Sequence, residues 1–281
     1  MPAQGHPDSA VNVTDNPGAT NSADAHASTR IPPARRAKLL LLDLAAKTCR
    51  YLEPPPDDVI NMAESDPKTS QLFHEQYFPT SIFYTDLAES AALNLELVRH
   101  IYAWKSEDPE GIVRSNFKQA GSWHSQLDMH EKPQFSALTD QIIKAAVEVF
   151  SGMNYDMDFA PVIDNMWANI NPRYGYNRSH SHPDTLWSGV YYIQAPENCG
   201  RISFNDPRSQ AQVYTPRMGA NANTDSSSWS EVYYGPIPGR LILFPGWLVH
   251  EVEPNLSTLE GDAGNRISVS FNIYQSSTRS G

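Results

Sequence analysis

After Gly152 the sequence changes from helical spacing to an alternation of period two, and this change constrains the fold more than any other feature. Short runs rich in Val, Ile, Tyr, Trp and Phe are separated by clusters of Pro, Gly and Asn. Such spacing is typical of an all-β sandwich or barrel. The predicted strands are 162–171, 186–194, 201–205, 229–234, 240–244, 248–253 and 267–275.

The first half of the chain shows a different pattern. Apolar residues recur at helical spacing over 34–52 and 134–150, and Leu138, Ile142, Ala145 and Val149 form one stripe of the second helix. Residues 1–30 contain no aromatic side chain and cannot bury enough apolar surface to offset the entropy of ordering.

These patterns predict three parts and a mainly β fold with flanking helices. We expect a disordered tail over 1–30, a helical extension over 31–77 and one domain over 78–281, whose β core spans about 158–275. The stretch 215–230, rich in Asn and Ser, is expected to be a mobile loop that could serve as a lid.

Charge and cysteine content exclude several classes of protein. The 281 residues carry a net charge of −11, and the one cluster of cations is Arg35, Arg36 and Lys38, so nucleic acid and anionic membranes are disfavoured as partners. No apolar run reaches the roughly 18 residues of a membrane span. Cys49 and Cys199 are too few for a disulfide framework. We expect a protein of the reducing cytoplasm.

Two predicted strands have one apolar and one polar face. The apolar positions are Met166, Ala168 and Ile170 in the first strand and Ile267, Val269, Phe271 and Ile273 in the second. The opposite faces carry Asn165, Trp167, Asn169 and Asn171 and, in the second strand, Arg266, Ser268, Ser270 and Asn272. A solvated sheet face is the more common explanation. The alternative is a polar barrel interior that holds a polar ligand.

Three histidines suggest a metal site when they are taken together. His180 and His182 project to the same side of an extended segment, and His250 lies in an otherwise apolar strand. Neither signal is strong alone, because an H-x-H pair can arise by chance and a histidine in an apolar strand is more often hydrogen-bonded in the core. Three imidazoles on one face of a metal would leave other coordination positions open for substrate and oxygen. Both interpretations of the three histidines, ordinary hydrogen-bonded residues and metal ligands, remain open.

A positively charged partner is predicted for this cluster. If 248–253 and 267–275 form a hairpin centred near Thr258, Arg266 lies opposite His250. A guanidinium in that position could bind a carboxylate in bidentate fashion.

The segments "NINPRYGYNRSHSHPDTLWSGVYYI", "LILFPGWLVHEVEP" and "NRISVSFNIY" resemble the 2-oxoglutarate and Fe(II)-dependent oxygenases, in their prolyl-hydroxylase-like branch. The segments "FPTSIFYTDL" and "SNFKQAGSWHS" resemble them more faintly, so the resemblance covers most of 78–275. It is carried by the order and spacing of His-x-His, a distal His followed by "EVEP", and Arg-x-Ser. The resemblance implies a double-stranded β-helix, or jelly roll, with flanking helices.

The resemblance also implies roles for individual residues. His180, His182 and His250 would hold Fe(II). The far carboxylate of 2-oxoglutarate would be bound by Arg266, supported by Ser268 and Tyr192, while Asn171 or Asn169 would lie near its metal-bound end.

Position 182 departs from the wider superfamily, which usually has Asp or Glu there. A neutral imidazole leaves the centre one charge more positive, which the dianionic cosubstrate could still neutralise. Asp184 is the alternative ligand, because His182-Pro183-Asp184 is itself an H-x-D sequence. We favour His180 and His182, since the family pattern reads H-x-H-P.

The expected activity is therefore that of a dioxygenase which couples decarboxylation of 2-oxoglutarate to hydroxylation of an unactivated carbon, with Fe(II), 2-oxoglutarate and O2 as cofactors. The substrate partner would be an amino acid, a peptidyl residue or a biosynthetic intermediate, and a homodimer is an open alternative for assembly. Trp187, Trp247, Tyr174 and Tyr176 are candidate pocket walls. The rival interpretations are a three-histidine cupin-like dioxygenase without 2-oxoglutarate and a non-catalytic β-barrel binding protein.

Overall fold

The computed structural model describes residues 76–213 and 229–278, together with Leu72, Arg217 and Gly219. The predicted tail over 1–30, the helix over 34–52, nearly all of the extension over 31–77 and most of the loop over 215–230 lie outside the described residues. The unit described below is Gln76–Gly281.

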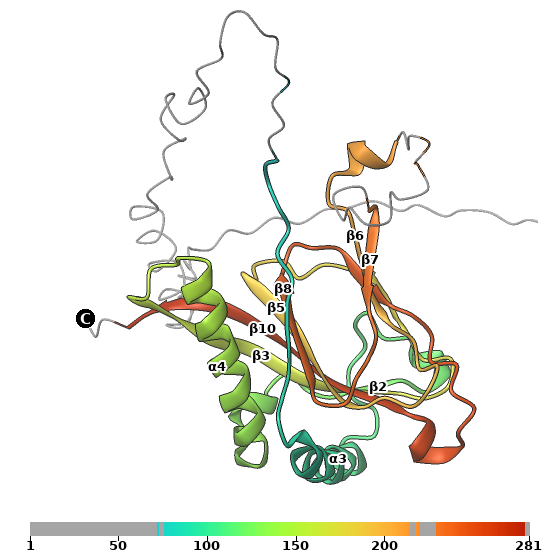
Figure 1. The fold of residues 1–281 in the computed structure, drawn as a ribbon. Helices are drawn as coiled ribbons and strands as arrows, with labels where there is room; N and C mark the ends of the chain where they lie inside the picture. Colours follow the sequence, from blue (N-terminus) through green and yellow to red (C-terminus); the bar gives the residue numbers. More distant parts are fainter. Residues whose placement is uncertain (1–71, 73–75, 214–216, 218, 220–228, 279–281) are drawn as a thin grey trace, which may run out of the picture. The chain divides into compact units, whose positions relative to one another are not determined.

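The core of this unit consists of two antiparallel β-sheets (Figure 1). In spatial order, the six-stranded sheet contains β1 (Phe83–Asp86), β8 (Arg240–Pro245), β5 (Trp187–Gln194), β10 (Arg266–Ser277), β3 (Phe159–Asn171) and β2 (Trp123–His124). The four-stranded sheet contains β4 (Asn177–His180), β9 (His250–Val252), β6 (Ile202–Asn205) and β7 (Glu231–Tyr234). The predicted double-stranded β-helix is confirmed by this arrangement.

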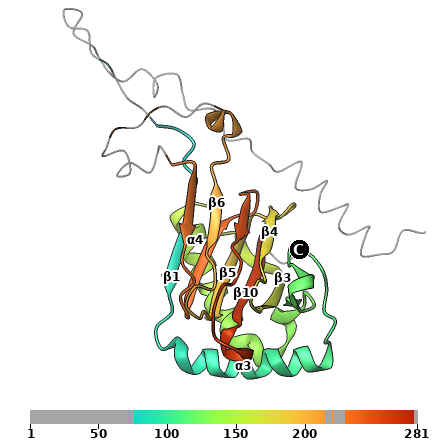
Figure 2. The same ribbon diagram turned by 90° about the vertical axis from the view of Figure 1, so that its right-hand side faces the viewer.

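Two helices cover the outer face of the six-stranded sheet: α3 (Ser90–Glu107) and α4 (Ser136–Gly152) (Figures 1 and 2). The helix expected over 134–150 is α4, and its Leu138, Ile142 and Val149 are buried as predicted. Helix α3 was not predicted, because its buried positions include the polar Asn94 and its apolar stripe is narrow. Short 3₁₀ helices complete the described part: η1 (Lys118–Ala120), η2 (Met129–Glu131), η3 (Pro133–Phe135), η4 (Ser209–Gln212) and η7 (Gly261–Gly264).

Alternation along the central strands separates two cores. The apolar faces of β3 and β10 pack against the helices, in a cluster that includes Ile170, Val269 and Phe271. A smaller apolar cluster lies between the two sheets and includes Val190, Phe204 and Phe244. Beside that second cluster the polar faces of β3 and β10 line a pocket inside the barrel. The interpretation as a polar barrel interior is therefore correct, and the alternative of a solvated sheet face is wrong.

The predicted hairpin between 248–253 and 267–275 is wrong. Strand β10 pairs with β3 and β5, whereas β9 pairs with β4 and β6 in the other sheet. The cross-strand partner of Arg266 is Asn171, and that of His250 is His180. The chain between β9 and β10 passes from one sheet to the other through η7, so the two strands face each other across the pocket instead of lying side by side.

No helix among the residues described is long and apolar enough to cross a membrane.

Candidate metal centre and cosubstrate pocket

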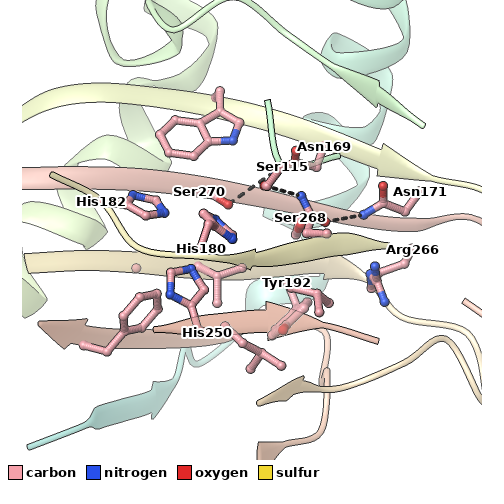
Figure 3. Close-up of a pocket in the computed structure, with 17 residues that line it drawn as sticks. Ser115, Asn169, Asn171, His180, His182, Tyr192, His250, Arg266, Ser268 and Ser270 are labelled. Atoms are coloured by element: carbon pink, nitrogen blue, oxygen red, sulfur yellow. Dashed lines mark hydrogen bonds between the residues drawn. The ribbon is translucent and has the colours of Figure 1, made fainter. Parts of the chain in front are cut away.

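Three histidines from the four-stranded sheet and the turn that follows β4 meet at one end of the pocket (Figure 3). His180 and His250 are cross-strand partners at the ends of β4 and β9. His182 follows β4, and its backbone N–H donates to the carbonyl of Gly246 at 2.8 Å. One ring nitrogen of each histidine lies within 4.8 Å of the others. Within 76–213 and 229–278, this is the group of His, Cys, Asp or Glu side chains whose geometry suits a metal ion.

Each imidazole is oriented by a hydrogen bond from its Nδ1. The acceptors are the backbone carbonyls of Arg178 for His180 (2.6 Å) and of Leu248 for His250 (2.9 Å), and the side-chain oxygen of Asn272 for His182 (2.6 Å). A carbonyl oxygen can only accept, so each Nδ1 carries the proton and each Nε2 carries a lone pair. This is the arrangement that protein partners impose on histidines that bind metals.

The environment keeps these rings neutral. Burial lowers the pKa of all three imidazoles, that of His182 to about 4 and that of His250 to about 3. Electrostatic repulsion from His180 lowers the pKa of the other two further. At neutral pH the cluster therefore offers the form of imidazole that coordinates a metal.

A buried positive charge lies at the other end of the pocket. Arg266 is 1% exposed, and its Nη1 donates to the carbonyls of Cys199 and Glu253, the latter at 2.9 Å. Its Nη2 and the hydroxyl of Tyr192 are buried without a hydrogen-bond partner. Burial raises the pKa of Tyr192, so this phenol stays protonated and can donate. No salt bridge to Arg266 occurs among the described residues.

Two unused donors and an unpaired charge in a buried site fit a carboxylate ligand. Leaving such groups unsatisfied is costly, and a carboxylate would accept from both. The neighbouring Ser268 lies between Tyr192 and Asn169, its cross-strand partners in β5 and β3. The residues present therefore fit the far carboxylate of 2-oxoglutarate.

Polar side chains connect the two ends of the pocket. Asn169 donates to Ser270 at 3.2 Å, Asn171 donates to Asn177 at 3.3 Å, and the carbonyl oxygen of each asparagine is buried without a partner. Asn171 lies at the Arg266 end, whereas Asn169 lies closer to the histidines (Figure 3). Of these two predicted residues, Asn169 is therefore the better placed for the metal-bound end of a cosubstrate.

The predicted aromatic walls do not line the pocket. Trp187 is buried in the core and packs edge-to-face on Phe83, with ring centroids 5.6 Å apart. Trp247 and Tyr174 are exposed, and Tyr176 stacks on Phe117. These residues therefore serve packing or lie at the surface, and the expectation that they form pocket walls is wrong.

Trp167 lines the pocket instead, and it was not singled out from the sequence. Its ring stacks between those of His124 and His182, at centroid distances of 5.4 and 5.9 Å. The sequence could have identified it, because Trp167 is two residues from Asn169 and so shares the inner face of β3 with it.

Asp184, the alternative ligand, is exposed and does not line the pocket. Its backbone has φ 61°, in the left-handed region that Asp and Asn tolerate better than most residues. The turn at 183–184 thus directs the chain from His182 into β5.

Part of this chain matches a known protein family. Residues 165–272 match the family model described as "Putative 2OG-Fe(II) oxygenase". This segment runs from β3 to β10 and contains the three clustered histidines, Tyr192 and Arg266. A search of curated proteins found no match.

Solved structures similar to this chain include the following three. A prolyl-4-hydroxylase from Pseudomonas putida is 14% identical, with a TM-score of 0.47 over 69% of this chain and 92% of that one. The alpha-ketoglutarate-dependent carbocyclase SnoK from nogalamycin biosynthesis is 13% identical, with a TM-score of 0.48 over 69% and 79%. HygX from Streptomyces hygroscopicus, with nickel and 2-oxoglutarate bound, is 12% identical, with a TM-score of 0.45 over 69% and 82%.

The family match confirms the resemblance seen in the sequence. The segment that builds the pocket matches the family of putative 2OG-Fe(II) oxygenases, and this family uses Fe(II), 2-oxoglutarate and O2.

Proposed function

We propose that this protein couples oxidative decarboxylation of 2-oxoglutarate to hydroxylation of a small-molecule or peptidyl substrate, with His180, His182 and His250 as the iron ligands. The observation that carries the proposal is the pairing of two features in one pocket. Three imidazoles present Nε2 lone pairs at one end, and the unpaired donors of Arg266 and Tyr192 lie at the other.

The chain's own residues have distinct tasks in this proposal. The three imidazoles would hold Fe(II), and Arg266 and Tyr192 would bind the far carboxylate of 2-oxoglutarate. Ser268 and Asn169, which follow on the same inner surface, would orient the rest of the cosubstrate. Phe244 packs edge-to-face on His250, with centroids 4.6 Å apart, and helps exclude water from the metal end.

When bound, Fe(II) supplies the oxidative decarboxylation of 2-oxoglutarate to succinate and CO2 together with O2-dependent oxidation of the substrate. Because no ligand or partner of a ligand in this cluster is a carboxylate, the dianionic cosubstrate is the natural source of compensating charge.

Anaerobic Fe(II) titration followed by succinate assays tests this proposal. We expect one iron per chain, 2-oxoglutarate binding only to the iron-loaded protein, and succinate release that rises with the right member of a substrate panel. Oxygen uptake without any need for 2-oxoglutarate would favour the three-histidine cupin-like dioxygenase. Ligand binding without oxygen uptake would favour a binding protein.

A glycine beside Arg266 gives a separate prediction. Gly200 has φ +85°, and a Cβ there would lie 2.4 Å from the carbonyl of Glu253 and 2.8 Å from Nη1 of Arg266. We expect Gly200→Ala to displace the guanidinium and to weaken 2-oxoglutarate binding roughly 10-fold or more, while Fe(II) binding is retained. Isothermal titration with each ligand measures both affinities. Equal 2-oxoglutarate affinity in wild type and variant would contradict the prediction.

A further inference from the structure

The bond that orients His182 differs from those of its two neighbours. His180 and His250 donate to the backbone carbonyls of residues 178 and 248, which are close by in sequence. These acceptors are present whatever side chains those two positions carry. His182 donates instead to the side chain of Asn272, 90 residues away on β10. The hydrogen bond from Nδ1 of His182 therefore depends on one particular side chain.

Asn272 is held by both neighbouring strands. Its Oδ1 accepts from Nδ1 of His182 at 2.6 Å and from the hydroxyl of Ser188 at 2.7 Å. Its Nδ2 donates to Oδ1 of Asn165 at 2.8 Å. Ser188 and Asn165 are the cross-strand partners of Asn272 on β5 and β3, and Asn272 is 8% exposed.

Asp164 determines which group donates and which accepts in each of these hydrogen bonds. Nδ2 of Asn165 donates to the carboxylate of Asp164 at 2.7 Å, and an ionised carboxylate can only accept. Asn165 must then present its oxygen to Nδ2 of Asn272, and Asn272 must present its own oxygen to His182. Nδ1 of His182 is consequently the protonated nitrogen, and Nε2 is free for a metal.

A β-bulge makes possible this relay, by which we mean the hydrogen bonds that connect Asp164, Asn165 and Asn272. The pairing of β3 with β10 shifts so that Asn272 faces Asn165 while Ile273 faces Ile163, which leaves Asp164 as the extra residue. Ile163 packs into the core under the helices, yet Asn165 reaches the inner face two residues later. In a regular strand both would lie on the same face. The bulge thus places a carboxylate and an amide in line with Asn272.

We propose that Asn272 is a positioning residue, which, through the Asp164–Asn165 relay, holds His182 in the Nδ1-protonated tautomer that a metal requires. This inference rests on the proposed ligand set. The hydrogen-bond acceptor of His182 is then a neutral amide, so neither the three ligands nor their hydrogen-bond partners carry negative charge.

Three variants of the full-length protein test the role of Asn272. Asn272→Leu removes the acceptor, Asn272→Asp keeps an acceptor and makes it anionic, and Ser188→Ala removes the other donor to the same oxygen while leaving the His182 bond in place. Long-range ¹H–¹⁵N spectra of the metal-free protein report which ring nitrogen of His182 carries the proton. Anaerobic titration then gives the Fe(II) affinity.

We expect His182 to be protonated on Nδ1 in wild type, in Ser188→Ala and in Asn272→Asp, and to show a mixture of tautomers in Asn272→Leu. Fe(II) affinity should fall about 10- to 100-fold in Asn272→Leu, the usual effect of losing such a partner, and should return to at least the wild-type value in Asn272→Asp. Ser188→Ala should bind iron as wild type does.

Two outcomes would overturn the inference, and they are distinguishable. If Asn272→Leu keeps the Nδ1-protonated tautomer and loses no more iron affinity than Ser188→Ala, the role of Asn272 is only structural while the proposed function stands. If wild type binds no Fe(II), the proposed function and this inference both fail.

Discussion

Replacing His182 by alanine is expected to abolish tight Fe(II) binding and 2-oxoglutarate turnover together. The variant leaves two imidazoles where the structure brings three within 4.8 Å of one another. Loss of a direct ligand should exceed the roughly 10- to 100-fold penalty that follows loss of a supporting partner. Anaerobic Fe(II) titration, followed by succinate measurement with 2-oxoglutarate and O2, gives both quantities.

Asp184→Asn is the matched control. It removes the only carboxylate of the H-x-H-P-D segment and keeps a residue type that tolerates the left-handed backbone at φ 61°. Because Asp184 is exposed and outside the pocket lining, we expect wild-type iron affinity in this variant. His182→Asp should retain iron, since it supplies the carboxylate that the wider superfamily uses. Iron loss in Asp184→Asn with retention in His182→Ala would replace our ligand set by one that contains Asp184.

Arg266→Ala should weaken 2-oxoglutarate binding by roughly 30- to 1000-fold, or about 2 to 4 kcal/mol, because it removes a buried, charge-assisted contact to a carboxylate. Iron affinity should change little, since Arg266 lies at the opposite end of the pocket from the histidines (Figure 3). The measurement is a titration of the Fe(II)-loaded protein with 2-oxoglutarate under anaerobic conditions.

Arg266 is also a large buried side chain with backbone partners, so its loss could destabilise the fold. Tyr192→Phe provides a second variant, because it removes only the unpaired hydroxyl and leaves the ring in the core between the sheets. We expect a smaller loss of 2-oxoglutarate affinity, about 10-fold, with an unchanged melting temperature. Wild-type 2-oxoglutarate affinity in both variants would remove the reason for assigning this cosubstrate.

The strand pattern of the sequence was sufficient to predict which residues share a face. Alternation at period two requires that Arg266, Ser268 and Ser270 project to one side of a strand, whatever its neighbours are. For the same reason His180 and His182 could be assigned to one side of their segment. The polar strand faces, the central strands and the candidate site residues on them were therefore accessible without a structure. Whether those faces meet solvent or the interior of a barrel was not.

The sequence did not show which strands pair with one another. Hydrogen-bonded pairing joins segments far apart in the chain, and a strand has the same alternation of apolar and polar residues whichever strand it pairs with. The hairpin that would have placed Arg266 beside His250 was wrong for this reason, although both residues line the same pocket. The assignment of Trp187 to a pocket wall failed similarly, since the period of a strand does not say which of its faces meets the helices.

The sequence by itself thus determined the β-rich fold, the polar strand faces and the histidines and arginine that the pocket contains. Only the tertiary structure decided how they meet. The two sheets face each other and so bring Arg266 and the histidines to opposite ends of one pocket. The bulge at Asp164 places Asn165 beside Asn272, the hydrogen-bond partner of His182. Both depend on the register between strands that are distant in the chain, which is set by the packing of the whole barrel and not by any local preference.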